Sequence, residues 1–357
     1  MKTHRKIAFP RYAEYNCALK YFVEQGLDAD YILQPTLTRR TEELGAKYSP
    51  DFVCTPFKTL LGSMIESLEA GADTLFMTHG FCRLGYFGEL QEQILRDLGY
   101  SFDFLNLAEY STGKKKDWVR AIKWVNPKAN LGKLTLRVRD TMKMVRYLDQ
   151  VTAFYYENCG FDATGGTLHD IYQQFLAAMY TVTSRREIEA LYQRTMDRLR
   201  KVPLDKPAHP LRVGIVGELY TVMDPFSNLE LEKKLADMGV EIHRWMNLTN
   251  RLIDYPGEKN LHPAIQDLCT YEMGPTSTAN IWCARKYAQQ GFDGLIHIKS
   301  ASCTPEIDVM PVLQNISSDC KIPLLCLTYD SQTSDVGLMT RLEAFYDMID
   351  AKKRMRR

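Results

Sequence analysis

The sequence has no long hydrophobic run and almost no net charge. No segment approaches the roughly 20 apolar residues that cross a membrane, and the N-terminus, MKTHRKIAFPRYAEY, lacks the apolar core of a signal peptide. Its 45 Lys and Arg residues and 44 Asp and Glu residues give a net charge of +1. Composition therefore supports no general affinity for nucleic acid or acidic membranes. We expect a cytoplasmic protein.

Several short motifs are also missing. There is no Cys-x-x-Cys pair, so the zinc-ribbon signature is absent. Neither a Walker loop nor a Gly-x-Gly-x-x-Gly fingerprint occurs, so we expect no ATP or NAD site on this chain. Nine cysteines is an odd number, and without a secretory signal it argues against a disulfide framework. The thiols therefore either pack as small apolar residues or bind a metal.

Short apolar runs alternate with amphipathic segments in two parts of the chain, which is typical of parallel sheets connected by helices. The predicted strands begin at Lys6, Tyr31, Thr74, Phe102, Leu211, Glu241, Leu295 and Pro323. The predicted helices cover residues 14–25, 57–70, 88–98, 228–238, 276–289 and 337–349. The sequence therefore predicts an α/β fold with two doubly wound lobes.

The strand pattern stops between the two lobes. Residues 114–202 carry long charged amphipathic patterns typical of helices. The proline-rich segment PLDKPAHP at 203–210 cannot continue a helix and is predicted to be a linker. We therefore expect an N-terminal lobe at 1–113, a helical segment at 114–202 and a C-terminal lobe at 211–357.

Three cysteines are placed where an open parallel sheet binds its ligands, beyond the carboxyl ends of the strands. Cys54 precedes the predicted helix at 57–70, Cys82 follows the strand from Thr74, and Cys303 follows the strand from Leu295. Each leads toward a predicted helix start, where the helix dipole favours a thiolate. The alternative is that all three are packed in the core, which is the commonest environment of cysteine outside disulfides.

Three thiolates suit an iron–sulfur cluster better than structural zinc, because zinc needs a fourth protein ligand to complete its tetrahedral site. A four-iron cluster held by three cysteines leaves one iron open to water or to a substrate oxygen. We therefore expect such a cluster to be catalytic rather than a simple electron carrier.

Five sequence blocks, in order, resemble the signature blocks of the 2-hydroxyacyl-CoA dehydratase component family, above all its activase-associated branch: CTPFKTLLGSMIESLEAGAD, GFCRLGYFGELQ, IVGELY, CTPEI and TRLEAFYD. The resemblance spans nearly the whole chain and is weakest over about 114–202. It implies flavodoxin-like or Rossmann-like lobes and a [4Fe-4S] cluster bound by Cys54, Cys82 and Cys303. It also implies a lyase, or a component of one, that receives a low-potential electron from an ATP-dependent activase for the radical dehydration of an acyl-CoA.

The family resemblance does not identify the substrate. For the assembly it implies either a homodimer or a complex with a second dehydratase-like subunit. The glycine-rich run before the second cysteine is shortened here to THGF at 78–81, and the Asp-Glu pair after the last strand is Asp330 and Ser331. These departures bear on the substrate more than on cluster binding.

Two alternative functions remain open. A related branch carries a double-cubane [8Fe-9S] cluster and reduces small molecules, and it needs about twice as many thiolates. Cys159 and Cys269 are the candidate extra ligands. The other alternative is a cluster-free subunit that only binds the activase or a partner.

Three further side chains are candidates for roles at the site, and a fourth, which is an acid, has a simpler explanation. Arg83 could pair with the cluster's negative charge or a CoA phosphate, and His79 could donate a hydrogen bond near the cluster. Glu218, after the glycine turn of the second lobe, could be an acid/base or positioning group. Glu306 is predicted to be an early-turn acid favoured by the helix dipole. An ordinary surface arginine and an ordinary loop histidine remain the alternatives for Arg83 and His79.

Overall fold

The computed structural model describes the chain except for residues 1–3, 78–85, 107–114, 272, 331 and 356–357. Two compact units are present. One comprises Met1–Val145 with Ala177–Ala190, and the other comprises Arg146–Leu176 with Leu191–Arg357. Each unit contains a four-stranded sheet flanked by helices, so the predicted α/β fold with two parallel sheets is confirmed.

The sheet of the first unit is entirely parallel. Its strands are β1 (Lys6–Ala8), β2 (Asp30–Tyr31), β3 (Thr74–Met77) and β4 (Asp103–Asn106), in the order β2-β1-β3-β4. All four residues of β3 are buried, as expected for a parallel strand covered on both faces. All four strands predicted for this lobe are present.

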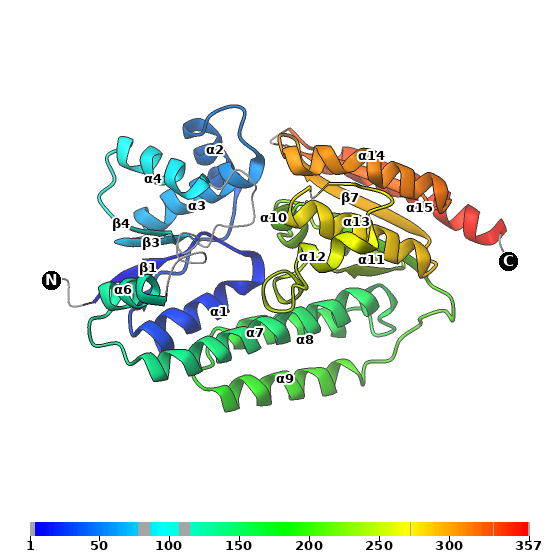
Figure 1. Ribbon diagram of the computed structural model, residues 1–357. Helices are drawn as coiled ribbons and strands as arrows, with labels where there is room; N and C mark the ends of the chain where they lie inside the picture. The colour runs from blue at the N-terminus through cyan, green and yellow to red at the C-terminus, as the bar shows by residue number, and fades with distance from the viewer. Residues whose placement is uncertain (1–3, 78–85, 107–114, 272, 331, 356–357) are drawn as a thin grey trace. The chain divides into compact units, whose positions relative to one another are not determined.

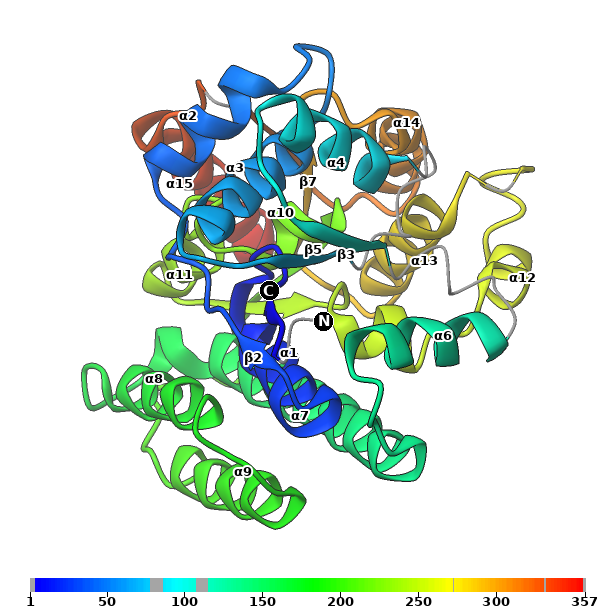
Figure 2. The ribbon, with the colours of Figure 1, turned by 90° about the vertical axis from the view of Figure 1, so that its left-hand side faces the viewer.

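Helices cover both faces of this first sheet (Figures 1 and 2). They are α1 (Asn16–Tyr21, continued by a π-helical turn over Phe22–Leu27), α2 (Arg39–Tyr48), α3 (Thr55–Glu69), α4 (Phe87–Asp97) and α6 (Lys115–Val125). In Figure 1, α3 and α4 lie on one side of the sheet and α1 and α6 on the other.

Helices α2 and α3 pack through glycine. A Cβ atom added to Gly45 would lie 1.9 Å from the carbonyl oxygen of Lys58, and one added to Gly62 would lie 2.0 Å from that of Thr41. The predictions did not include α2, because its inward face is made by Gly45 and Thr41 rather than by large apolar residues. Hydrophobic periodicity therefore could not reveal it.

The second unit repeats the strand order of the first. Its strands are β5 (Leu211–Gly217), β6 (Val240–Arg244), β7 (Gly294–Ser300) and β8 (Leu324–Tyr329), all parallel and in the order β6-β5-β7-β8. In both sheets the first strand of the unit lies between the second and the third. The β1/β3 and β5/β7 pairs are therefore topological switch points, where open α/β sheets bind ligands beyond the strand ends.

The helices of the second unit follow the same α/β alternation. They are α10 (Leu219–Met223), α11 (Leu231–Asp237), α12 (Glu258–Leu261), α13 (Pro275–Gln289), α14 (Thr304–Asp319) and α15 (Asp335–Met355). Buried residues of α13 and α14, including Ile281, Val309 and Leu313, form a core cluster with Leu295 of β7. Helix α15 packs by Leu338, Leu342, Phe345 and Ile349, a helical spacing that places them on one face.

The part of the chain that follows β4 and precedes β5 is helical, as predicted. It contains α6, α7 (Leu131–Asn158), α8 (Thr167–Met179) and α9 (Arg185–Leu199). Helix α6 belongs to the first unit, whereas α7, α8 and α9 are each divided between the two units. Within the second unit, Tyr155 of α7 stacks on Tyr172 of α8 with ring centroids 4.3 Å apart. Among the described residues, no helix is long and apolar enough to span a membrane.

Candidate functional site

Cys303 lies at the start of α14, directly beyond the carboxyl end of β7. Its backbone N–H donates to the carbonyl of Ser300 over 3.1 Å, and its carbonyl accepts from the N–H of Ile307 over 3.0 Å. Cys303 is the N-cap residue, but its side chain does not cap the helix. The thiol is half-buried, and it lies at the positive end of the helix dipole.

Cys54 has the same local structure in the first unit. It is the N-cap residue of α3, its side chain makes no capping hydrogen bond, and it is half-buried. Thr55 and Pro56 follow it, as Thr304 and Pro305 follow Cys303. Proline suits the first turn of a helix because the missing N–H would have no partner there. The Cys-Thr-Pro sequence therefore begins a helix in each unit.

Cys54 and Cys303 reach the carboxyl edges of their sheets by different routes. Cys303 directly follows a strand, as predicted. Cys54 instead precedes α3, the crossover helix that leads into β3. Because a crossover helix runs back along its parallel sheet, its N-terminus lies at the carboxyl edge of the strands.

Cys82, His79 and Arg83 lie within 78–85, outside the described residues. Strand β3 ends at Met77, so this segment begins directly beyond the strand. By strand order, the equivalent connection in the second unit follows β7 and contains Cys303.

Glu218 follows Gly217 at the end of β5 and is the N-cap residue of α10. Its Oε1 accepts from the N–H of Tyr220 over 2.8 Å, and its Oε2 accepts from the N–H of Thr221 over 2.8 Å and from the Thr221 hydroxyl over 2.7 Å. Burial raises the pKa of Glu218, the three hydrogen bonds oppose that shift, and the negative charge of Glu306 adds to it, so the net shift is upward. The carboxylate thus has a clear structural role.

Gly217 fixes how the turn before Glu218 approaches β7. Its φ is +151°, and a Cβ atom there would lie 2.0 Å from the carbonyl oxygen of Ile298. That same carbonyl accepts the N–H of Glu218 over 2.9 Å. Only glycine fits here, and its close approach places Glu218 beside β7 at the switch point.

A buried charged pair that the sequence pattern did not reveal lies beneath this edge of the sheet. Glu306, in the first turn of α14, and His297, in the middle of β7, both have an exposed fraction of 0%. Their Oε2 and Nε2 atoms lie 2.7 Å apart. Glu306 is therefore a buried ion-pair partner, and the prediction of a simple early-turn acid was incomplete. The available signal was a histidine inside an apolar strand, followed by an acid at the start of the next helix.

The pKa of His297 rises despite its burial. Burial alone would lower that pKa, but the neighbouring Cys326 thiol and Glu306 carboxylate outweigh it and raise the pKa to about 9. Cys326 faces His297 across the β7–β8 pair. Among the described residues, the Nδ1 atom of His297 has no hydrogen-bond partner. Near neutral pH His297 therefore keeps its proton beside Glu306.

The two candidate extra ligands have unfavourable surroundings. Burial raises the pKa of the Cys159 thiol to about 12, which keeps it protonated. The Cys269 thiol is buried in the core cluster and donates to the carbonyl of Tyr271 over 3.0 Å. Within the described parts of the chain, no group of three or more His, Cys, Asp or Glu side chains is arranged to hold a metal ion.

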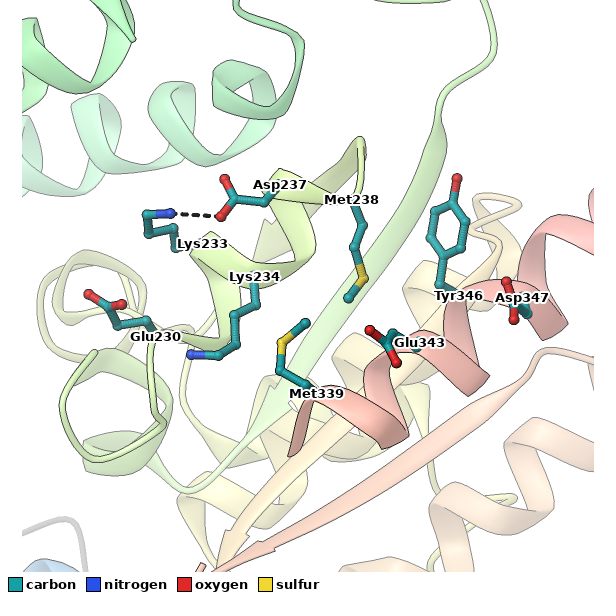
Figure 3. Close-up of a pocket in the computed structure, with 9 residues that line it drawn as sticks. All are labelled: Glu230, Lys233, Lys234, Asp237, Met238, Met339, Glu343, Tyr346 and Asp347. Carbon is teal, nitrogen blue, oxygen red and sulfur yellow. Dashed lines mark hydrogen bonds and ion pairs between the residues drawn. The ribbon is translucent and has the colours of Figure 1, made fainter. Parts of the chain in front are cut away.

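Two cavities among the described residues of the second unit lie away from these residues. One of about 690 Å³ lies between α11 and α15, where Lys233, Asp237 and Glu343 line it with Met238 and Met339 (Figure 3). Another, of about 250 Å³, lies between the end of α7 and β6. Of the described site residues, Cys54, Cys303 and Glu218 line neither cavity. We therefore locate the candidate site by strand topology and side-chain chemistry.

Comparison with known proteins adds little. No family model matches the chain, and no curated protein matches it. Among solved structures, the periplasmic zinc-binding protein TroA from Treponema pallidum aligns over 97% of both chains, with 12% sequence identity and a TM-score of 0.21. A TM-score this low supports no inference about fold, ligand or activity.

Proposed function

We propose that this chain is the iron–sulfur component of a 2-hydroxyacyl-CoA dehydratase-type system in the cytoplasm, either the lyase itself or a component of it. Cys54, Cys82 and Cys303 would bind a [4Fe-4S] cluster, and an ATP-dependent activase would supply its electron. The ordered sequence blocks support the family. The observation that carries the proposal is the Cys-Thr-Pro helix start at the carboxyl edge of a parallel sheet in each unit.

The described thiols suit this cluster. Cys54 and Cys303 are half-buried at helix N-termini and do not cap their helices, so both have the surroundings of a thiolate ligand. Burial raises the pKa of Cys17 to about 12 and raises that of Cys283 well above its ordinary value, so these two thiols stay protonated. Thiolates are soft ligands of the kind that iron–sulfur clusters use, and Cys54 and Cys303 suit that role better than the two protonated thiols do. When bound, the cluster would supply an electron and an open iron that acts as a Lewis acid.

Glu218 supports this role from the second unit. It lies directly beyond β5, next to the strand that leads to Cys303. Since its pKa is raised, it keeps a proton to a higher pH than an ordinary glutamate. We assign it to holding the α10 turn, and its protonated form would supply a proton to a ligand bound at the cluster.

Iron and sulfide analysis of anaerobically purified protein tests the proposal. We expect about four irons and four sulfides per chain, whereas about eight irons would instead favour the double-cubane reductase. Iron-free protein, prepared without exposure to air, would eliminate both cluster hypotheses and leave the partner-binding subunit. The ligand assignment predicts that Cys82→Ala abolishes iron binding, and unchanged iron in that variant would refute it.

A further inference from the structure

A buried polar network connects four segments of the second unit beneath the carboxyl edge of its sheet. Asn280 of α13 is 1% exposed, and its Nδ2 donates to both carboxylate oxygens of Glu306, over 2.9 and 3.0 Å. The same carboxylate pairs with His297 of β7. One carboxylate thus connects α13, β7 and the first turn of α14.

Asn280 also fixes the end of β5. Its Oδ1 accepts the N–H of Gly217 over 3.0 Å, and its Nδ2 donates to the carbonyl of Gly217 over 3.1 Å. This pair of hydrogen bonds satisfies both backbone groups of Gly217 through a single side chain. The residue that follows is Glu218, so the network sets the geometry of the Glu218 turn as well.

Helix α13 holds the start of α14 at a second point. The hydroxyl of Ser277 donates to the carbonyl of Pro305 over 3.0 Å. Ser277 is fully buried, as is Glu306 one residue after Pro305. The backbone between Cys303 and Glu306 is therefore held from α13 by two independent contacts.

Stability alone does not account for this network. Burying a carboxylate, an imidazolium and an amide is costly, and well-packed apolar residues of the same volume are often at least as stabilising. Ile281, Val309 and Leu313 already pack α13 and α14 against the sheet. What the polar network adds is direction, because hydrogen bonds fix the angle and register of a turn and apolar contacts do not.

We propose that Asn280, His297 and Glu306 are positioning residues that hold the Cys303 turn and the Glu218 turn in fixed geometry on either side of the β5/β7 switch point. The assignment of Cys303 as a ligand rests on the proposed function. The positioning itself is a property of the protein and is measurable without a cluster.

The test measures the reactivity of Cys303 in the full chain after its iron is removed with a chelator. N-Ethylmaleimide labelling is followed by peptide mass spectrometry, and exposed Cys320 at the other end of α14 serves as the internal standard. We expect Glu306→Ala and Asn280→Ala to raise the labelling rate of Cys303 relative to Cys320 about fivefold to tenfold, because the turn opens more often. Glu306→Gln, which keeps the shape and one acceptor, should restore the ratio to within about twofold.

Two controls separate positioning from general stability. Glu343→Ala removes an exposed carboxylate of α15 in the same unit and should leave the ratio unchanged. Thermal unfolding is recorded for every variant. A lower Tm with an unchanged ratio would mean that the network only stabilises the fold, and it would overturn the proposal. If the alanine variants fail to fold, His297→Gln, which removes the imidazole that pairs with Glu306, must still raise the ratio.

A spectroscopic readout extends the test to loaded protein. The electron paramagnetic resonance signal of the reduced cluster should change in Glu306→Ala and stay unchanged in Glu343→Ala. Absence of iron from the wild-type protein would refute the proposed function, and the labelling ratio would still decide the positioning. An unchanged signal together with an unchanged ratio would overturn the positioning alone.

Discussion

At the scale of single residues, His297 shows how the surroundings decide a side chain's charge. The imidazole is fully buried, which disfavours its cation, yet Cys326 and Glu306 raise its pKa to about 9. Sequence alone identifies a histidine in an apolar strand but cannot identify its partner. Asn280 and Glu306 come from two different helices, and only the packing of those helices on β7 brings the three side chains together.

The raised pKa of His297 predicts a pH-dependent stability. A folded-state pKa of about 9 against an ordinary value of 6.5 means that the folded state binds the proton more tightly. This stabilisation is complete below pH about 6.5 and is lost as pH rises through about 9, by up to about 3 kcal/mol. Urea unfolding at several pH values measures it. His297→Gln should have a much flatter profile in this window, and an equal decline in that variant would contradict the assignment.

Gly217 and Gly239 form a matched pair for a test of backbone geometry. Both have positive φ, +151° and +75°, but a Cβ atom meets the Ile298 carbonyl at 2.0 Å only at Gly217. We expect Gly217→Ala to lower the free energy of unfolding by about 3 kcal/mol or more, and Gly239→Ala by only about 1 kcal/mol. Denaturant titration compares them. Equal losses would show that the β5 turn tolerates a side chain.

At the scale of helices and strands, most of the structure follows from the sequence. Every predicted strand is present, because runs rich in Ile, Val, Leu and Phe are buried on both faces of a parallel sheet.

Two helices that the sequence pattern did not predict have physical explanations. Helix α2 presents glycine to its partner, and α14 contains Pro311, which argues against a helix in sequence-based reasoning. Of the candidate site, the sequence predicts the positions of Cys54 and Cys303, because strand ends and helix starts can be recognised in the pattern.

The close approach of α2 to α3 predicts a stability effect in the first unit. Gly62→Ala places a Cβ atom 2.0 Å from the backbone of Thr41, so α2 must move away from the helix that begins at Cys54. We expect a loss of about 2 kcal/mol or more, seen as a Tm lower by several degrees. Gly132→Ala in α7, where the nearest atom is an Asn130 side-chain oxygen at 3.3 Å, should change Tm little. A similar Tm for both variants would disprove the tight packing.

At the scale of the whole molecule, the two units share one topology without a clear repeat in sequence. Each has four parallel strands in the same local order, and each uses Cys-Thr-Pro to begin a helix at the carboxyl edge. The periodicity of the sequence predicts both sheets. It does not predict the sharing of the helical region between the units, since that division depends on long-range packing along α7.

The most direct test of the central claim is the iron content of the anaerobically purified chain in three forms: wild type, Cys303→Ala and Cys320→Ala. Cys303 begins α14 beside the switch point, whereas Cys320 lies exposed at the far end of the same helix. We predict about four irons per chain in the wild type and in Cys320→Ala, and almost none in Cys303→Ala. Wild-type protein without iron, or a Cys303→Ala variant that keeps its full iron content, would contradict the account.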